Sequence, residues 1–64
     1  MATKRLVIYP KDIMLITGRS ERYCRYMITR MRKHFQKEAH QMITIREFAE
    51  YFGLDPDEVS ETLI

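Results

Sequence analysis

Two glycines, Gly18 and Gly53, constrain this 64-residue chain more than any other feature of its sequence. Each follows a short stretch with the apolar spacing of a helix, and each is followed two residues later by a helix-capping residue type, Ser20 or Asp55. Glycine is common just after a helix, because it lacks the Cβ atom that makes the left-handed backbone conformation costly. The sequence therefore predicts the same arrangement twice: a helix, a glycine turn, a capping residue and a second helix.

A shift of 35 residues superimposes the first half of the sequence on the second. Asp12, Ile13, Gly18, Ser20, Cys24 and Ile28 fall on Glu47, Phe48, Gly53, Asp55, Val59 and Leu63. An ancestral duplication would produce this match, and so would the ordinary sequence signals of helical hairpins, which recur in unrelated proteins. Both explanations stay open at the level of sequence, and both predict two similar helical units.

Capping signals and apolar periodicity predict a single all-α domain over residues 1–64, built from about four short helices. Pro10 suits the first position of the first helix, where its missing N–H group would have no partner. The second helix is predicted from Ser20 to about Gln36, with apolar residues at steps of three and four. These residues are Cys24, Met27, Ile28, Met31 and Phe35. One face of this helix is therefore expected in the core and the other in solvent.

Two further helices are predicted in the second half of the chain. The third, roughly residues 45–52, follows a T-x-x-E sequence formed by Thr44 and Glu47. This spacing lets each side chain accept the free backbone N–H group of the other residue, an arrangement called a capping box. The fourth helix is predicted to start at Pro56, in an acidic first turn that suits the positive end of a helix dipole.

Apolar residues form only short runs. The longest, at 6–9 and 13–16, contain four residues each, far fewer than the roughly 20 that span a bilayer. We expect no signal segment and no membrane partner. The stretch at 6–9 is instead a candidate to pair with the β-branched stretch at 42–45 as a small two-stranded ribbon. The composition, 45% hydrophobic and 31% charged, is typical of a soluble folded protein.

Few residues in the chain can carry chemistry. Cys24 is the only cysteine and falls on the apolar face of the second helix, which predicts a small core side chain in a reducing, cytoplasmic compartment. His34 and His40 have no paired carboxylate or third ligand at a useful spacing, and no phosphate-binding glycine loop is present. The sequence therefore predicts no enzyme, no metal site, no cofactor and no small-molecule substrate.

Charge is distributed unevenly along the chain, although the formal net charge is only +2. Residues 19–37 contain seven basic residues and one acidic residue, whereas residues 38–64 contain one basic residue and seven acidic residues. A helix gathers the basic residues of the first segment on its outward side. That side suits nucleic acid, whose phosphates attract cations and repel the acidic segment, so the acidic segment is expected to act as scaffold or partner surface.

The sequence PKDIMLITGRSERYCRYMITRMR, residues 10–32, resembles the helix-turn-helix of bacterial DNA-binding proteins. Gly18 matches the turn glycine of that family. Its buried positions are matched by Ile13, Met14, Cys24, Ile28 and Met31. In the family the second helix enters the major groove. The resemblance implies a regulator of transcription or an accessory factor of a mobile element.

Carried over by position, the resemblance also implies which residues contact double-stranded DNA. The base-reading set is Ser20, Glu21, Arg22, Arg25, Tyr26 and Thr29. Arginine can fork onto guanine O6 and N7, and glutamate can accept from cytosine N4, so side-chain chemistry agrees with this set. The residues better suited to backbone phosphates are Lys4, Arg5, Arg19, Arg30, Arg32 and Lys33. Phosphate contacts position a helix without specifying a base sequence.

The basic helix is also compatible with a different class of function, a protein-interaction module that docks an acidic partner. The acidic third of the same chain, or of a second copy, is one such partner. Apolar residues in the acidic segment further predict a homodimer through the C-terminal helices, which would suit palindromic DNA sites. These apolar residues are Phe48, Tyr51, Phe52, Leu54 and Leu63.

Overall fold

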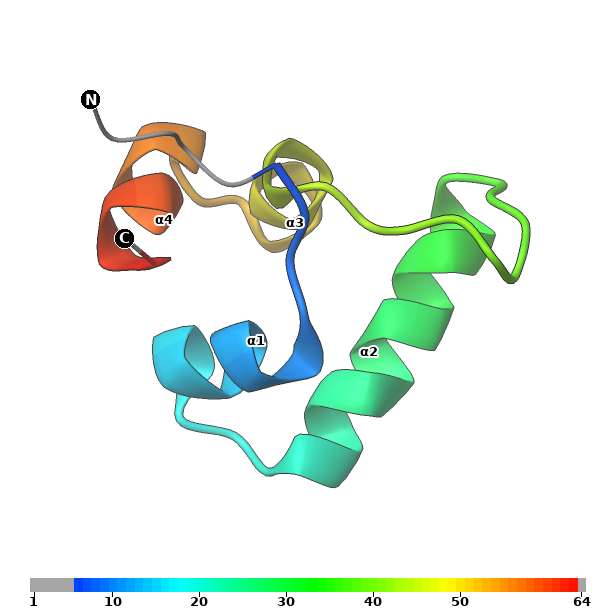
Figure 1. Ribbon diagram of the computed structural model, residues 1–64, viewed down its shortest axis with the longest axis horizontal. Coiled ribbons are helices and arrows are strands. Elements are labelled where there is room, and N and C mark those ends of the chain that lie inside the picture. The colour runs from blue at the N-terminus through cyan, green and yellow to red at the C-terminus, as the bar shows by residue number, and fades with distance from the viewer. Residues whose placement is uncertain (1–5, 64) are drawn as a thin grey trace.

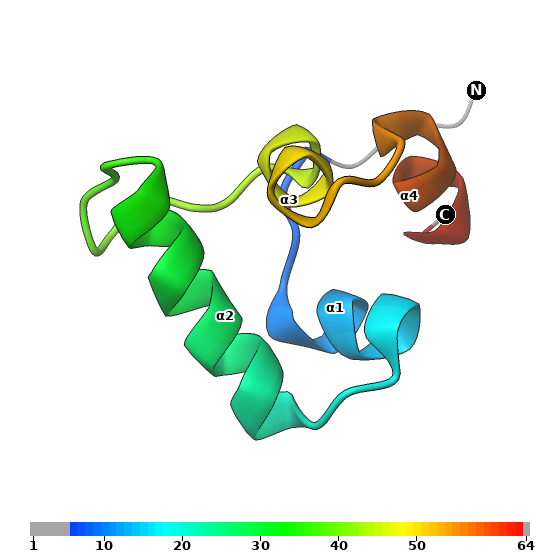
Figure 2. The same ribbon diagram turned by 180° about the vertical axis from the view of Figure 1, so that it is seen from behind.

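Four α-helices make up the fold in the computed structural model, which describes residues 6–63 (Figure 1). They are α1 (Pro10–Thr17), α2 (Glu21–His34), α3 (Ile45–Phe52) and α4 (Pro56–Leu63). α1 packs against α2 and α4, and α3 packs against α4. Views from opposite sides place α2 along one side of the molecule and α4 on the other, with α1 and α3 between them (Figure 1, Figure 2). The predicted all-α fold of four helices is confirmed.

The two glycine turns have the same geometry. Gly18 and Gly53 each have a φ of 72°, in the left-handed region, and no neighbouring atom lies within 4 Å of the place where a Cβ atom would stand. After the turn, Ser20 caps α2 and Asp55 caps α4, each by accepting a backbone N–H group of the first turn, at 3.2 Å and 2.9 Å. The predicted order of helix, glycine turn, cap and helix is therefore present in both halves.

The first helix of each half also begins in a similar way. Thr44 and Glu47 form the predicted capping box: the Thr44 N–H donates to Glu47 Oε1 at 2.9 Å, and the Glu47 N–H donates to Thr44 Oγ1 at 3.0 Å. At the start of α1, the Tyr9 N–H donates to Asp12 Oδ2 at 2.8 Å. Since the 35-residue shift relates Tyr9 to Thr44 and Asp12 to Glu47, the carboxylate half of the box recurs at the same position.

The two halves meet at an extended contact between equivalent residues. Ile8 and Ile43, which the 35-residue shift also relates, are each 1% exposed, and the Ile8 N–H donates to the Ile43 carbonyl at 3.0 Å. Beside them, Val7 forms an antiparallel bridge with Thr44. Within residues 6–63 this bridge is all that forms of the predicted ribbon, and no strand is present there. Pairing stops because each extended segment turns almost at once into a helix, α1 or α3.

Both halves contribute to one hydrophobic core. Its buried side chains are Ile8, Ile13, Cys24, Ile28, Met31, Ile43, Ile45, Phe48, Ala49 and Val59. Equivalent positions are buried alike: Ile13 and Phe48 are both fully buried, and Cys24 and Val59 are 0% and 4% exposed. The predicted core position of Cys24 is confirmed. Since neither hairpin has a core of its own, each depends on the other for burial.

α2 ends at His34, slightly before the predicted end near Gln36. Gln36 has a φ of 55°, and the N–H of Lys37 reaches back to the carbonyl of Arg32 at 2.8 Å. This hydrogen bond closes the helix with a left-handed residue, as glycine does after α1 and α3. Because glutamine is uncommon in that conformation, the sequence carries no clear signal for this end of the helix.

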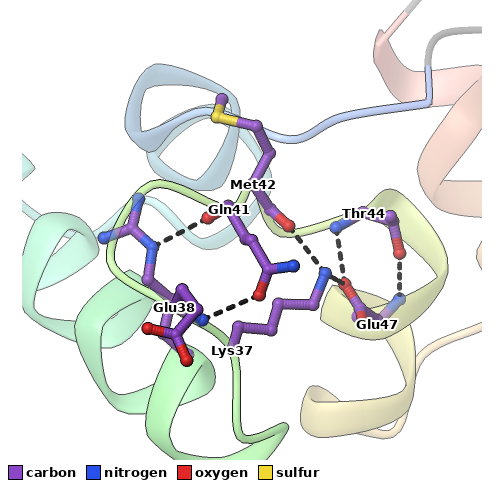
Figure 3. A network of polar contacts seen from close by, with 7 residues as sticks. Lys37, Glu38, Gln41, Met42, Thr44 and Glu47 are labelled. Atoms are coloured by element: carbon purple, nitrogen blue, oxygen red, sulfur yellow. Dashed lines mark hydrogen bonds and ion pairs between the residues drawn. The ribbon is translucent and has the colours of Figure 1, made fainter.

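A polar network fixes the connection between α2 and α3 (Figure 3). The Lys37 Nζ lies 2.6 Å from Glu47 Oε1 and donates to the Met42 carbonyl at 2.7 Å. On the α2 side, Arg32 Nε donates to the Gln41 carbonyl at 3.0 Å. The connection is thereby attached both to the end of α2 and to the start of α3. These contacts help to fix the position of one half of the chain relative to the other.

Candidate nucleic-acid interface

α2 turns one apolar stripe to the core and exposes most of its remaining residues. Cys24, Ile28 and Met31 form the buried stripe, at steps of four and three. The residues predicted to read bases lie outside this stripe or at the N-cap, and all of them are exposed: Ser20, Glu21, Arg22, Arg25, Tyr26 and Thr29. The fold therefore brings these six residues together on one surface, which we call the outward face of α2.

The predicted phosphate-contacting residues differ in how free their side chains are. Arg30 and Lys33 are exposed on α2 beside the outward face. Arg32 is half-buried, and its Nε donates to a backbone carbonyl of the following loop, so part of its hydrogen-bonding capacity is used within the fold. Lys4 and Arg5 lie outside the described residues. The predicted set is thus only partly brought together.

One ion pair lies within the outward face. Arg25 Nη2 and Nε lie 2.6 Å and 3.0 Å from Glu21 Oε2, one helical turn away. Both side chains are exposed, and exposed pairs at this spacing contribute only about 0.3–0.5 kcal/mol. A ligand could therefore replace either partner at a small cost in free energy.

Arg22 and Lys33 are free cations on this side of α2. Within residues 6–63, neither makes an ion pair or a side-chain hydrogen bond. Arg22, Tyr26, Thr29 and Lys33 follow one another at steps of four, three and four, so they line up along the helix opposite the buried stripe. All the N–H donors of Arg22 and Lys33 are therefore available to a ligand.

Aromatic rings hold two further arginines. The Arg19 guanidinium, exposed in the turn before α2, lies 4.0 Å from the centroid of the Tyr23 ring. Within α2, Arg30 Nη1 donates to Oη of Tyr26, one helical turn earlier, at 3.3 Å. Tyr23 is half-buried, whereas Tyr26 is exposed. These contacts orient each guanidinium and leave its other N–H donors open.

The acidic helices do not cover the outward face of α2. α4 lies across the molecule from α2 in both views (Figure 1, Figure 2). In the part of the chain that the structure describes, the pair between Lys37 and Glu47 is the only ion pair between the basic segment and the acidic one. The basic helix is therefore not neutralised by the acidic third of its own chain.

The ionisation of Glu47 is set by its place at this junction. Partial burial has the largest single effect and raises the pKa of the carboxyl group. The hydrogen bond and positive charge of Lys37, together with hydrogen bonds from Thr44, outweigh it and bring the pKa below its ordinary value. Glu47 is consequently a fixed negative charge at neutral pH, and Lys37 compensates it.

A hollow of about 370 Å³ lies between α2 and the extended segment before α1. Its walls include Arg25 and Arg32 from α2, together with Tyr9 and Met42, which are both exposed. Three residues of the predicted sites, Arg25, Thr29 and Arg32, thus border one cavity, although none was assigned to a pocket from the sequence.

A second hollow, of about 470 Å³, lies on the opposite flank of α2, toward α3. Its walls include His34 and Tyr51, which were not among the predicted site residues. His34 follows the exposed Lys33 in sequence, and this neighbour could have suggested its position. Tyr51 belongs to the acidic half, and only the fold brings its ring within 5.1 Å of the His34 ring, measured between centroids.

No protein family, curated protein or solved structure matches the chain. Among residues 6–63, no three His, Cys, Asp or Glu side chains are grouped so that they could hold a metal ion. None of the helices described here has both the length and the apolar character needed to cross a membrane.

Proposed function

We propose that this protein is a non-enzymatic DNA-binding protein of the helix-turn-helix type, which lays α2 in the major groove of a DNA duplex. The observation that carries this proposal is the exposed, basic outward face of α2, which no acidic helix covers. The major groove admits a single α-helix, and the 14 residues of α2 give it a length of about 21 Å.

The proposed roles follow from where each side chain lies on α2. Arg22 is free to fork onto guanine, while Arg25 would first have to leave Glu21. Arg30 and Lys33 flank the outward face and would contact backbone phosphates, which position the helix. Sequence preference would therefore depend mainly on Arg22 and Arg25, and general affinity on the flanking cations.

Such a protein would act as a bacterial regulator of transcription or as an accessory factor of a mobile element. A homodimer would match a palindromic site, but the described fold leaves little apolar surface for the predicted contact. Of the five apolar residues named for that contact, Phe48 is fully buried, three are half-buried, and only Leu54, at 42%, is largely exposed. The homodimer stays a prediction, to be checked by sedimentation equilibrium.

The proposal is tested by fluorescence anisotropy of a labelled random-sequence duplex, titrated with the protein at two salt concentrations. We expect binding in the micromolar range that weakens steeply with salt, because each neutralised phosphate contributes about 0.9 to the log–log slope. Absence of binding even at low salt would overturn the proposal.

The 35-residue correspondence between the two halves supplies a matched control for this experiment. The 35-residue shift relates Arg22 on α2 to Asp57 on α4, and both residues are exposed near the start of their helix. Arg22→Ala should weaken duplex binding by about tenfold at low salt without changing stability. Asp57→Ala changes the net charge in the opposite direction and should leave binding unchanged or slightly tighter. Equal weakening in both variants would mean that α2 is not the binding element.

The competing function, docking of the basic helix on an acidic partner, is favoured by one observation. α4 lies across the molecule from α2 (Figure 1) and carries exposed Asp57, Glu58 and Glu61, so a second copy could present its acidic helix to the basic one. Self-association by this contact would appear in sedimentation velocity at low salt and disappear at high salt. Its presence, combined with no duplex binding, would support this alternative over DNA binding.

A further inference from the structure

The hollow on the α3 side of α2 has an unusual lining for a surface that borders the acidic half of the chain. It is lined by Tyr26, Thr29, Arg30, Lys33, His34 and Tyr51. Two of these side chains are permanent cations, three carry a hydroxyl group, and none is acidic. The lining thus offers hydrogen-bond donors and positive charge together, which is the combination that an anionic oxygen group requires.

The Tyr26 phenol group orients the central cation of this hollow. Arg30 Nη1 donates to Tyr26 Oη at 3.3 Å. This hydrogen bond, with a second contribution from Tyr51, raises the pKa of the Arg30 guanidinium. Arg30 is therefore held by a tyrosine of α2, and Tyr51 of α3 lines the same hollow.

The Tyr51 ring is firmly placed by its neighbours. It makes an edge contact with His34, at 5.1 Å between centroids, and another with Phe52, at 5.5 Å. The nearest acidic residue on the same side of α3, Glu47, lies one turn before Tyr51 and is held 2.6 Å from the Lys37 ammonium. Its charge is therefore compensated, and it does not oppose an anion in the hollow.

We infer that this hollow binds one phosphate group of a DNA backbone strand, with Arg30 and Lys33 as charged contacts and Tyr51 as a hydroxyl donor from α3. The inference rests on the proposed function, since the hollow borders the outward face of α2. It adds a DNA contact from the acidic half of the chain. From its charge pattern alone, that half is expected to act only as scaffold or partner surface. Hydroxyl and guanidinium groups are usual partners of DNA phosphates, and the Tyr51 hydroxyl group is an uncharged donor that a phosphate does not repel.

Duplex titrations over a range of salt concentrations test this inference with matched variants. Arg30→Gln should reduce the log–log salt slope by about one phosphate, or 0.9, and weaken binding several-fold for every duplex sequence alike. Arg46→Gln removes the same charge from another side of α3 and should leave the slope unchanged. Tyr51→Phe keeps the ring and removes only the hydroxyl group, and should weaken binding by about three- to tenfold.

Thermal unfolding of each variant shows whether the fold is intact. If the wild-type protein binds the duplex, and Arg30→Gln and Tyr51→Phe both leave affinity and salt slope unchanged, the phosphate site is overturned while the proposed function stands. If the wild-type protein does not bind the duplex, the proposed function is overturned instead.

A titration with inorganic phosphate then tests directly whether the hollow binds phosphate. Backbone amide chemical shifts are recorded by NMR at each phosphate concentration. Saturable shifts at Lys33, His34 and Tyr51 that are lost in Arg30→Gln would support the phosphate site independently of DNA. Shifts spread over all exposed cations, or none at all, would overturn it.

Discussion

The α1–α2 hairpin and the α3–α4 hairpin share their backbone geometry and differ in charge. Both start with a carboxylate that accepts a backbone N–H group, from Asp12 or Glu47, and both turn at a glycine with the same φ of 72°. At an exposed position of the second helix, however, Arg22 in one corresponds to Asp57 in the other. Caps, turns and buried positions thus define the shape, while exposed positions are free to carry either charge.

The largest effects are expected at the equivalent core positions of the two hairpins, Ile13 and Phe48, which are both fully buried. Phe48→Ala should lower the free energy of unfolding by about 3–5 kcal/mol, and Ile13→Ala by about 2–5 kcal/mol, because each leaves a cavity. Losses of this size unfold most of a small domain, so Ile13→Val, at about 1 kcal/mol, serves as a milder variant.

Urea unfolding followed by circular dichroism measures these changes, and hydrogen exchange shows which helices remain protected. Because the hairpins share one core, each substitution should lower the hydrogen-exchange protection of both hairpins together. A variant in which one hairpin stays protected while the other opens would contradict the shared core.

The two glycine turns should respond equally to the same substitution. Gly18→Ala and Gly53→Ala each force a Cβ atom into the left-handed region, which costs about 1–2 kcal/mol, and no neighbouring atom adds a clash at either site. Thermal unfolding of the two single variants measures the comparison. A loss confined to one of them would show that the two turns are not energetically equivalent.

The smallest effect is expected at Glu47, the capping carboxylate of the second hairpin, which pairs with Lys37. Its pKa is lowered in the folded state, so its stabilisation is complete above the ordinary value of about 4.5 and is lost as pH falls through the lower folded pKa. Glu47→Gln should lose at most about 1 kcal/mol at pH 7 and show a flatter decline in stability below pH 4.5.

Melting temperatures between pH 7 and pH 3 test this expectation. Glu50→Gln is the control, since Glu50 is exposed and makes no ion pair within the described residues. If the melting temperature of Glu47→Gln falls with pH as steeply as that of the wild-type protein, other carboxylates cause the pH dependence.

Most of the fold could be predicted because its signals are local. Helix caps, turn glycines and apolar periodicity act between residues a few positions apart, and the bounds of α1 and α3 follow directly from them. The end of α2 was less accurately predicted, since it depends on Gln36 adopting a left-handed conformation. The predicted ribbon between 6–9 and 42–45 shrank to one bridge, because pairing over such a distance competes with two helix starts.

The local features of the candidate site could also be predicted from the sequence, whereas its tertiary contacts could not. Helical periodicity alone predicts that the outward face of α2 is exposed, and the spacing of Glu21 and Arg25 is that of an ion pair. The contact of Arg32 with the following loop, and the approach of Tyr51 to His34, depend on tertiary packing and have no sequence signal. DNA binding itself stays a prediction for the titration to decide.

The contact between Ile8 and Ile43 has a consequence for how the chain folds during synthesis. Ile8 is among the first described residues to be made, and its buried partner follows 35 residues later. The α1–α2 hairpin can form early from neighbouring residues, yet its inner surface stays uncovered until α3 has been added. Completion of the core is thereby delayed until the second hairpin has been translated, and the nascent first hairpin exposes apolar surface in the meantime.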